Sequence, residues 1–385
     1  MNRRLATSLR GFVDCTDASA PAKLFRALAL PASFLYSLVI RARNLLYDLG
    51  VCPQTHVGRA TVAVGNVTLG GVGKTPFVGW LTRKCLDLDV TPGLVSRGYM
   101  AKEQSSLYDA RSTSPQSNGA LNDEALEQAL RFPTTPHFLG SNRVEVAKAL
   151  LSARPDVDAI ILDDAFQHRR IARDLNILLL DALNPFGGGR VVPAGFLREP
   201  LSGIKRADAV ILSRADLVPD AERETIRKKV AKIAPKAVWA EIAQRPVDVF
   251  EYERPDEKDS SPKRTDYISW RNAFATRRFV AFCGLGAPAG FRKTLARENL
   301  DVRSFLPFPD HCAYSEDDYR RILDEAARVN ADAFVVTLKD FVKLREFISQ
   351  SPAPVFALGV GIEFLTGQEQ FEVLISAAIK ARSYN

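Results

Sequence analysis

The fold is decided by the stretch Gly65-Asn66-Val67-Thr68-Leu69-Gly70-Gly71-Val72-Gly73-Lys74-Thr75-Pro76. It follows a short apolar, β-branched run at 60–64 and precedes apolar residues at helical spacing, with Pro76 suited to the first turn of a helix. A strand, a glycine-rich loop and a helix in this order are typical of a phosphate-binding loop. A glycine-rich structural turn is the alternative interpretation. We expect a protein that binds a nucleoside triphosphate.

The residue types of this loop match the needs of phosphate binding. Glycines let backbone N–H groups turn toward phosphate oxygens, Lys74 is expected to reach the β- and γ-phosphates, and the Thr75 hydroxyl is expected to bind Mg²⁺. The strict motif has a glycine where this chain has Thr68, so the assignment depends on the context of the loop. The expected nucleotide-binding residues are Thr68, Gly70, Gly71, Val72, Gly73, Lys74, Thr75 and Pro76.

The composition is that of a globular enzyme. The chain has 385 residues, 46% hydrophobic and 25% charged, which at about 150 residues per domain corresponds to two or three domains. Its net charge of +7 suits an anionic partner, which could be a nucleotide, a nucleic acid or an acidic membrane surface. The five cysteines are scattered and form no Cys-x-x-Cys pair, which favours a reducing cytoplasm.

An apolar segment with aromatic residues, 24–40, lies before the loop and is followed by Arg41 and Arg43. It is too short and too interrupted to cross a bilayer, and we do not expect a cleaved secretory signal, because no long apolar core directly follows the basic residues at 3–10. A helix lying in a membrane interface near anionic lipid would have this composition. A helix packed on the protein's own core is the alternative, and composition does not separate the two.

The remainder of the chain predicts an α/β protein with a P-loop NTPase-like parallel sheet and helices on both faces. Compact apolar runs separated by helical lengths occur at 91–96, 159–162, 176–180 and 209–212, then at 278–283, 333–337 and 355–358. A polar stretch, 251–264, interrupts them and is interpreted as a linker or exposed loop. The predicted division is an N-terminal apolar or amphipathic helical segment, 1–50, a P-loop core, 51–250, a linker, 251–268, and a smaller C-terminal α/β domain, 269–385.

Acidic pairs follow one predicted strand and precede one predicted helix. Asp163 and Asp164 end the run at 159–162, so they are expected at the carboxyl edge of the sheet near the nucleotide phosphates, with one of them meeting Mg²⁺. A helix cap or a surface ion pair is the alternative there. Asp123 and Glu124 precede a helix, and from spacing alone N-terminal capping by Asp123 is favoured.

Basic residues complete the candidate site. His311 follows Asp310, whose carboxylate would orient it and raise its basicity, although an exposed loop histidine fits equally well. The glycine-rich segments 184–200 and 96–99 carry arginines suited to bidentate phosphate recognition, with surface ion pairs as the alternative. The residues concerned are Arg97, Arg190 and Arg198, and Gln167 and His168 follow the acidic pair at 163–164.

Taken in order, these segments resemble the tetraacyldisaccharide 4'-kinase family of lipid A biosynthesis over nearly the whole chain. The resemblance rests on seven blocks: 43–50, 65–76, 96–99, 123–124, 163–169, 189–200 and 308–311. The loop of this family reads Gly-Asn-x-Thr-x-Gly-Gly-x-Gly-Lys-Thr-Pro, which accounts for Thr68. The resemblance implies that ATP phosphorylates the 4'-hydroxyl of a tetraacyldisaccharide 1-phosphate, a glycolipid, at the cytoplasmic face of the inner membrane. The protein would be peripheral, with an anionic membrane surface and no nucleic acid as partner.

The resemblance also implies roles for individual residues. Asp123 would be the general base, paired with His311 from the C-terminal domain, and domain closure would precede reaction. Asp164 would support the base or the metal, and Lys74 would neutralise phosphate charge. The expected Mg²⁺ ligands are Thr75, Glu124 and Asp163, and the expected substrate residues are Asn66, Arg97, Gln167, His168, Arg190 and Arg198.

Some features depart from the family pattern. Ala125 and Ala165 stand where proline and glycine are usual, and Leu338 stands where a glutamate is common, so 337–340 is left out of the predicted site. Two other hypotheses are considered. A P-loop GTPase would use 212–216, which loosely resembles a guanine-specifying element, and a membrane-peripheral scaffold would use its nucleotide site to regulate partners.

Overall fold

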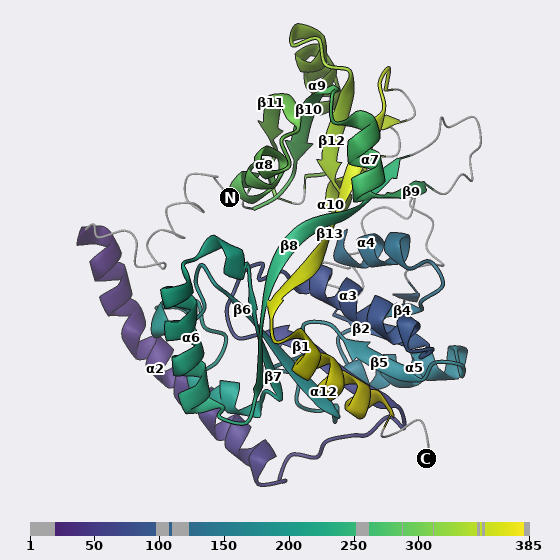
Figure 1. Cartoon of the computed structure of the whole chain (residues 1–385). Helices are drawn as coiled ribbons and strands as arrows, with labels where there is room; N and C mark the ends of the chain where they lie inside the picture. Colours follow the sequence, from purple (N-terminus) through teal and green to yellow (C-terminus); the bar gives the residue numbers. More distant parts are fainter. Residues whose placement is uncertain are drawn as a thin grey trace. The chain divides into compact units, whose positions relative to one another are not determined.

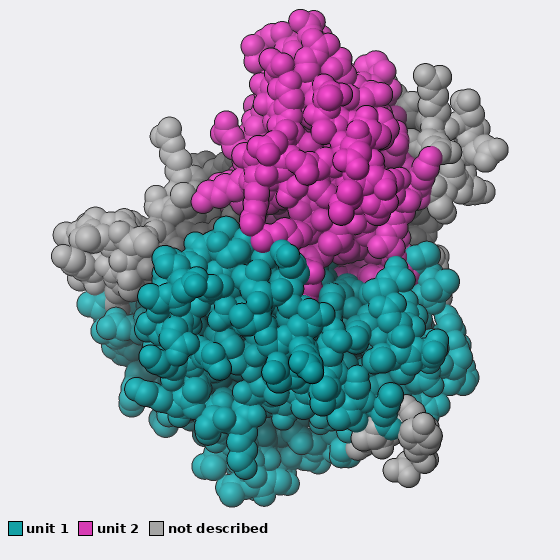
Figure 2. Space-filling model, in the orientation of Figure 1, with its two compact units in different colours: residues 1–120, 133–243, 363–385 teal, residues 121–132, 244–362 magenta. Residues whose placement is uncertain are grey.

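The computed structural model describes residues 20–97, 108–109, 123–251, 262–286, 288–310, 312–344, 347–348 and 351–380. His311 and most of the polar stretch at 251–264 lie outside the described residues. The chain divides into two compact units, shown in different colours in Figure 2. Unit 1 comprises residues 1–120, 133–243 and 363–385, and unit 2 comprises residues 121–132 and 244–362.

Unit 1 is built on a parallel sheet, as predicted. Its strand order is β7-β6-β1-β5-β2-β4-β3, with the first part of β8 beside β7. Only β3 runs antiparallel to its described neighbour. The strands are β1 (Ala60–Asn66), β2 (Pro92–Ser96), β3 (Tyr108–Asp109), β4 (His137–Leu139), β5 (Ala159–Leu162), β6 (Leu175–Asp181), β7 (Ala209–Ser213) and β8 (Val238–Glu251). Each residue of β1, β5 and β7 is buried, which explains why these strands are continuous apolar runs rather than alternating ones.

Helices flank the strands of this sheet (Figure 1) and bury their apolar side chains. One cluster joins Leu178 of β6 and Val210 of β7 to Ile226 and Val230 of α6. Another joins Ile160 of β5 and Val95 of β2 to α5. The helices of unit 1 are α2 (Ala20–Asp48), α3 (Lys74–Asp87), α5 (Arg143–Ala153), α6 (Asp220–Ile233) and α12 (Gln368–Lys380), with 3₁₀ turns at η1 (Gly187–Gly189), η2 (Leu201–Arg206) and η3 (Ala215–Leu217).

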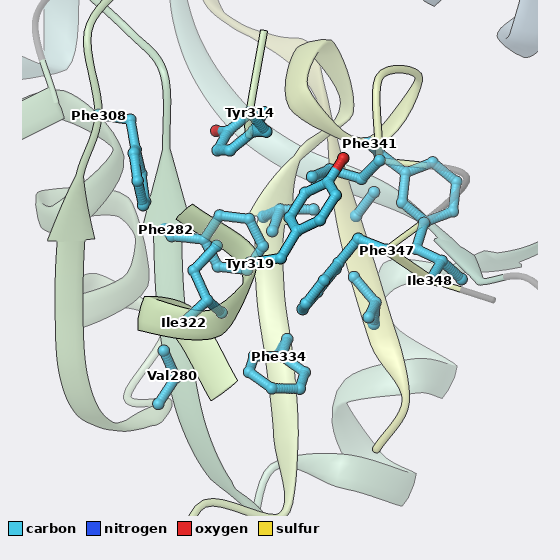
Figure 3. Close-up of a cluster of buried hydrophobic side chains, with 14 of the residues drawn as sticks. Val280, Phe282, Phe308, Tyr314, Tyr319, Ile322, Phe334, Phe341, Phe347 and Ile348 are labelled. Atoms are coloured by element: carbon cyan, nitrogen blue, oxygen red, sulfur yellow. The ribbon is translucent and has the colours of Figure 1, made fainter. Parts of the chain in front are cut away.

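Unit 2 has its own sheet and core. Its strand order is β11-β10-β12-β13-β8, with β9 antiparallel to the end of β8. The additional strands are β9 (Lys263–Asp266), β10 (Arg278–Cys283), β11 (Asp301–Pro307), β12 (Ala333–Thr337) and β13 (Val355–Thr366), and the helices are α4 (Asp123–Arg131), α7 (Tyr267–Phe274), α8 (Pro288–Arg297), α9 (Glu316–Arg328) and α10 (Leu338–Phe341). Phe282 lies edge-on to Phe308, Tyr314, Phe334 and Phe347 in the aromatic cluster that fills this core (Figure 3).

Each unit is made of segments that are separate in the sequence, whereas the predicted division assigns each part of the protein one continuous segment. The segment 263–266, predicted as linker, forms strand β9. Helix α4 belongs to unit 2 although it lies among unit 1 residues in the sequence, and α12 belongs to unit 1 although it is C-terminal. Strands β8 and β13 each begin in one unit and end in the other, which returns α12 to unit 1. Helix α4 belongs to unit 2 because it packs against α10.

Candidate active site

The phosphate-binding loop joins the buried end of β1 to the start of α3. Gly73 is the N-cap of α3 and has φ 85° and ψ 30°, a left-handed conformation that strains any residue with a Cβ. The loop is held from outside by backbone pairing with the segment after η1. Leu69 N donates to Phe196 O at 2.7 Å, and Arg198 N donates to Val67 O at 2.7 Å. The strand, loop and helix predicted from the sequence are therefore present. The loop ends at the N-terminus of α3, as it does in phosphate-binding loops.

A close contact fixes the loop against the acidic strand end. A Cβ placed on Gly65 would lie 2.6 Å from the backbone nitrogen of Phe166 and 2.7 Å from its Cβ. The backbone of 163–168 therefore approaches β1 as closely as a glycine allows. The N–H of Ala165 also donates to Val64 O at 3.0 Å. This contact brings Asp163 and Asp164, at the end of β5, to the same sheet edge as the loop.

Lys74 and Asp164 form an ion pair in this site. Lys74 Nζ lies 3.4 Å from Asp164 Oδ1, and Arg198 Nη1 lies 2.8 and 2.9 Å from the two carboxylate oxygens. Burial alone would raise the pKa of Asp164, but the charges of Lys74 and Arg198 outweigh burial, and the pKa lies below its ordinary value of 3.8. Asp164 is therefore ionised at neutral pH and orients both cations.

A buried carboxylate, Glu199, links the loop to helix α2. Its side chain is fully buried, and both oxygens accept from Arg206 at 2.8 Å. Gln167 Nε2 donates to Glu199 at 2.9 Å and to the backbone oxygen of Asn66 at 2.8 Å, and Asn44 of α2 donates to Glu199 at 3.1 Å. Asn66 in turn accepts from Lys74 Nζ at 3.2 Å. In this structure, Asn66 and Gln167, expected at the substrate, hold the loop in place.

The remaining predicted residues of unit 1 lie around this centre. His168 is partly buried, and burial together with Arg143 and Arg173 lowers its pKa to about 4, so the ring is neutral at pH 7. Its Nε2 has no hydrogen-bond partner among the described residues. Arg97 and Arg190 are exposed. Thr75, Pro76 and Asp163 are partly buried, and Thr68 and Val72 are buried in the loop.

The structure adds Arg214 to the residues around the phosphate-binding loop. Arg214 Nη2 donates to the backbone oxygen of Gly71, and its Nη1 lies 2.9 Å from Asp181 Oδ2 at the end of β6. In the sequence, Arg214 belongs to the segment that was considered only as a guanine-specifying element. Its position after β7, a strand parallel to β6, is the signal that could have placed it at the edge of the sheet that carries the loop.

Unit 2 contains the second group of candidate residues. Asp123 is in the first turn of α4 and is partly buried. Lys343 Nζ lies 3.1 Å from Asp123 Oδ2, and Lys339 Nζ lies 3.8 Å from the same oxygen. Lys339 also lies 3.3 Å from Asp310 Oδ1. The segment 337–340, which is left out of the predicted site, thus supplies a contact of Asp123 through Lys339.

Carboxylates are concentrated on α4. Glu124, a predicted Mg²⁺ ligand, is partly buried beside Asp123. The pKa of Glu127 is raised to about 7, chiefly because burial disfavours its charged form, and the charges of Glu124 and Asp248 add to this effect. His311, the predicted partner of Asp123, lies outside the described residues, so the structure does not test that pairing.

Helix α2 turns its polar side chains inward and its apolar side chains outward. Ser33 Oγ accepts from Ala194 N at 2.8 Å, and Tyr36 donates to the backbone oxygen of Arg198 at 2.8 Å. The exposed apolar residues of the helix are Leu28, Leu30, Phe34, Leu35, Leu38, Val39, Leu45 and Leu46. The predicted helix is confirmed. Among the side chains of this helix that the structure describes, Ala29 is buried and Tyr36 packs against the core, whereas most of the large aliphatic side chains and Phe34 are exposed. In the described part of the chain, no helix combines the length and apolar character needed to cross a bilayer.

Comparisons with known proteins agree with one another. The LpxK family model, tetraacyldisaccharide-1-P 4'-kinase, matches residues 25–380. A tetraacyldisaccharide 4'-kinase of Halothermothrix orenii is 32% identical over 94% of this chain and 95% of its own length, and one of Geobacter sulfurreducens is 34% identical over 89% and 90%. A crystal structure described as the "apo" form of LpxK from Aquifex aeolicus in complex with ATP is similar with a TM-score of 0.72 and 28% identity, covering 92% of this chain and 99% of that one.

Proposed function

Because the chain belongs to the tetraacyldisaccharide-1-P 4'-kinase family and has the activity of that family in lipid A biosynthesis, we propose which of its residues carry out the transfer. The GTPase and scaffold hypotheses have no support in these comparisons. The acceptor in this proposal is the 4'-hydroxyl of a tetraacyldisaccharide 1-phosphate, and the donor is ATP. The observation that carries the proposal is the loop at 65–76 with Lys74 held beside the ionised Asp164.

The loop binds the phosphates of ATP. Backbone N–H groups of residues 70–75 and the N-terminus of α3 supply donors and a favourable dipole for phosphate oxygens. When ATP binds, the ammonium group of Lys74 moves from Asp164 to the β- and γ-phosphates. There it neutralises the charge that develops as the phosphoryl group is transferred. Arg214, held to Gly71 and Asp181, supports the outer side of the loop. Phosphoryl transfer depends mainly on such positioning and charge neutralisation.

Asp123 acts as the general base. As the bond forms between the 4'-oxygen and the γ-phosphorus, the hydroxyl proton passes to the Asp123 carboxylate, and the bond from phosphorus to the bridging oxygen breaks with its electrons on ADP. A positioned carboxylate contributes about 100- to 10,000-fold to such steps. His311 is proposed as its partner.

Mg²⁺ is the proposed cofactor beside ATP. Among the described residues no group of three His, Cys, Asp or Glu side chains is gathered as a metal cage, which fits a cation that binds through one or two carboxylates, water and substrate phosphates. The Thr75 hydroxyl in the first turn of α3 and the Asp163 carboxylate at the end of β5 are hard oxygen ligands of the required kind. Glu124 is the third proposed ligand. When bound, the ion neutralises charge on the β- and γ-phosphates.

The exposed apolar face of α2 binds the membrane that contains the lipid substrate. Among the described side chains of this helix, eight large apolar ones are exposed, while Ser33 and Tyr36 are held by the loop at 194–198. A face of this kind is stabilised by burial at the boundary of headgroups and acyl chains. The exposed Arg41 and the net charge of +7 favour an anionic surface, the cytoplasmic leaflet of the inner membrane. Arg97 and Arg190, also exposed, are proposed to meet the 1-phosphate, with His168 as a neutral hydrogen-bonding group.

The experiment that tests this proposal is transfer of labelled γ-phosphate from ATP to detergent-dispersed tetraacyldisaccharide 1-phosphate by the intact chain and by Asp123→Ala. We expect labelled product with the first and a loss of at least about 100-fold in kcat with the second. Asp324→Asn, an exposed carboxylate in α9 of the same unit, is the matched control and should retain the rate of the intact chain. Equal rates for Asp123→Ala and the control would remove Asp123 from the mechanism.

A further inference from the structure

The feature that carries a further inference is a pair of lysines in contact with Asp123. Lys343 Nζ lies 3.1 Å and Lys339 Nζ 3.8 Å from Asp123 Oδ2, so both ammonium groups approach the same carboxylate oxygen. Between 13 and 16% of each of the three side chains is exposed. Solvent screens such a shielded pair less than a surface pair. The contact therefore restrains the position of the carboxylate more than an exposed salt bridge would.

The segment that carries these lysines is anchored by Asp340. This side chain is fully buried, and its Oδ1 accepts from Gly284 N and from the Tyr314 hydroxyl, each at 3.0 Å. Its Oδ2 accepts from Thr337 Oγ1 at 2.5 Å, and Thr337 in return caps α10 by accepting from the N–H of Asp340. The backbone of 337–343 is thus fixed to β10 and to the segment around Tyr314. The backbone from which the Lys339 and Lys343 side chains extend is therefore held in place.

Lys343 is also restrained at its charged end. Its ammonium group donates to the backbone oxygen of Cys312 at 3.3 Å and lies 3.9 Å from Asp340 Oδ1. An ammonium group has three donors and no acceptor. Asp123 and the backbone oxygen of Cys312 accept from Lys343, and the Asp340 carboxylate is a more distant ion-pair partner. Because a free lysine side chain has many rotamers, these contacts restrict the Lys343 side chain before substrate binds. Lys339 has a similar second contact, with Asp310.

We propose that Lys343 is a positioning residue for the general base Asp123, with Lys339 as a weaker second contact. This inference rests on the proposed role of Asp123. The Lys343 ammonium group holds one oxygen of the carboxylate in place, so that the carboxylate meets the acceptor hydroxyl in one orientation. It acts through Asp123 and has no contact of its own with the reacting atoms. A displacement of about 1 Å in a reacting group costs about 100-fold in rate, which sets the scale of the expected effect.

The test compares Lys343→Met, which keeps the length of the side chain without its charge, with Lys343→Arg, which keeps the charge. We expect Lys343→Met to lower kcat about 10- to 100-fold with the KM for ATP unchanged, since the nucleotide loop belongs to unit 1. Lys343→Arg should recover part of this loss. Lys293→Met, an exposed lysine of α8, is the matched control and should keep the kcat of the intact chain.

A double variant separates positioning from a general structural role. Because Lys343 acts through the Asp123 carboxylate, Asp123→Asn combined with Lys343→Met should be no slower than Asp123→Asn alone. The inference would be overturned if the loss of kcat in the double variant equalled the product of the losses in the two single variants. An unchanged kcat in Lys343→Met would also overturn it. If Asp123→Asn itself retains the kcat of the intact chain, the proposed base is wrong; if only Asp123→Asn is slow, the base stands and the positioning role falls. Should Lys343→Met fail to fold, Lys339→Met provides the same comparison with a smaller expected loss.

Discussion

The ammonium group of Lys74 lies 3.4 Å from the carboxylate of Asp164, at the junction of the phosphate-binding loop and the end of β5. Asp164 carries two cations, Lys74 and Arg198, and they hold its pKa below the ordinary value although burial opposes them. When a phosphate enters the loop, it takes the place of the Asp164 carboxylate as the anion beside Lys74. The ion pair thus prepares the lysine for a negatively charged ligand, since no unpaired buried charge has to be stabilised before ATP arrives.

Replacing Lys74 by methionine should weaken ATP binding about 10- to 100-fold, because a hydrogen bond to a charged group contributes about 1.5–3 kcal/mol. Phosphate transfer should fall further, since the same charge stabilises the transition state. Equilibrium binding of ATP, followed by calorimetry, measures the first effect. Lys148→Met, at an exposed position of α5, is the matched control. ATP affinity equal in the two variants would contradict the role of Lys74.

Replacing Gly65 by alanine should destabilise unit 1 and the loop together. The added Cβ would lie 2.6 Å from Phe166 N, a backbone atom of a buried segment, so β1 or the segment 163–168 must shift. Overpacking of this kind costs about 1–3 kcal/mol. The midpoint of urea denaturation and the affinity for ATP should both fall. Gly290→Ala is the control, because a Cβ there meets nothing within 4 Å, and its midpoint should not fall.

The elements near the loop were predictable because the evidence for them is contiguous in sequence. The run 60–64 and the residues up to Pro76 specify strand, loop and helix by local rules, and Asp163 and Asp164 follow a strand that pairs with β1. The lysine contacts of Asp123 were not predictable in the same way. Lys343 is 220 residues from Asp123 in the sequence, and the two residues meet because α4 packs against α10, a tertiary contact that local sequence rules do not describe.

The orientation of α2 also required the structure. Composition identified an apolar helix flanked by arginines, but a helix has an apolar face whether it is turned toward a core or toward a membrane. The choice is made by a few polar contacts from distant segments, such as Tyr36 to Arg198 and Ser33 to Ala194. These contacts depend on the path of the loop at 190–198, which local sequence rules do not describe.

Replacing Phe34 and Leu35 together by glutamine should reduce binding to anionic vesicles by at least about 100-fold, because these side chains are 74% and 62% exposed and burial of each contributes about 1.5–3 kcal/mol. Cosedimentation with vesicles of phosphatidylethanolamine and phosphatidylglycerol measures the partition. Val373→Gln, at a 66% exposed apolar position of α12, is the matched control and should bind like the intact chain. Unchanged partition of the double variant would show that α2 is not the membrane-binding face.

Replacing Glu127 by glutamine should change the dependence of stability on pH. Burial, reinforced by Glu124 and Asp248, raises the pKa of Glu127 from 4.5 to about 7 in the folded chain, in spite of the attraction of Arg131. Between these two pH values the folded chain binds more protons at this site than the unfolded chain, so the free energy of unfolding falls as pH rises through the window. The loss is complete above pH 7 and absent below pH 4.5.

Glutamine carries no charge at either pH, so Glu127→Gln should lose less stability than the intact chain between pH 5 and pH 8 and should be the more stable of the two at pH 8. Urea denaturation midpoints at the two pH values measure the difference. Asp324→Asn, in the exposed face of α9, controls for the loss of one carboxylate. Parallel pH profiles for Glu127→Gln and the intact chain would show that Glu127 is ionised at neutral pH. The cluster of carboxylates on α4 would then carry one more negative charge beside Asp123 than its burial indicates.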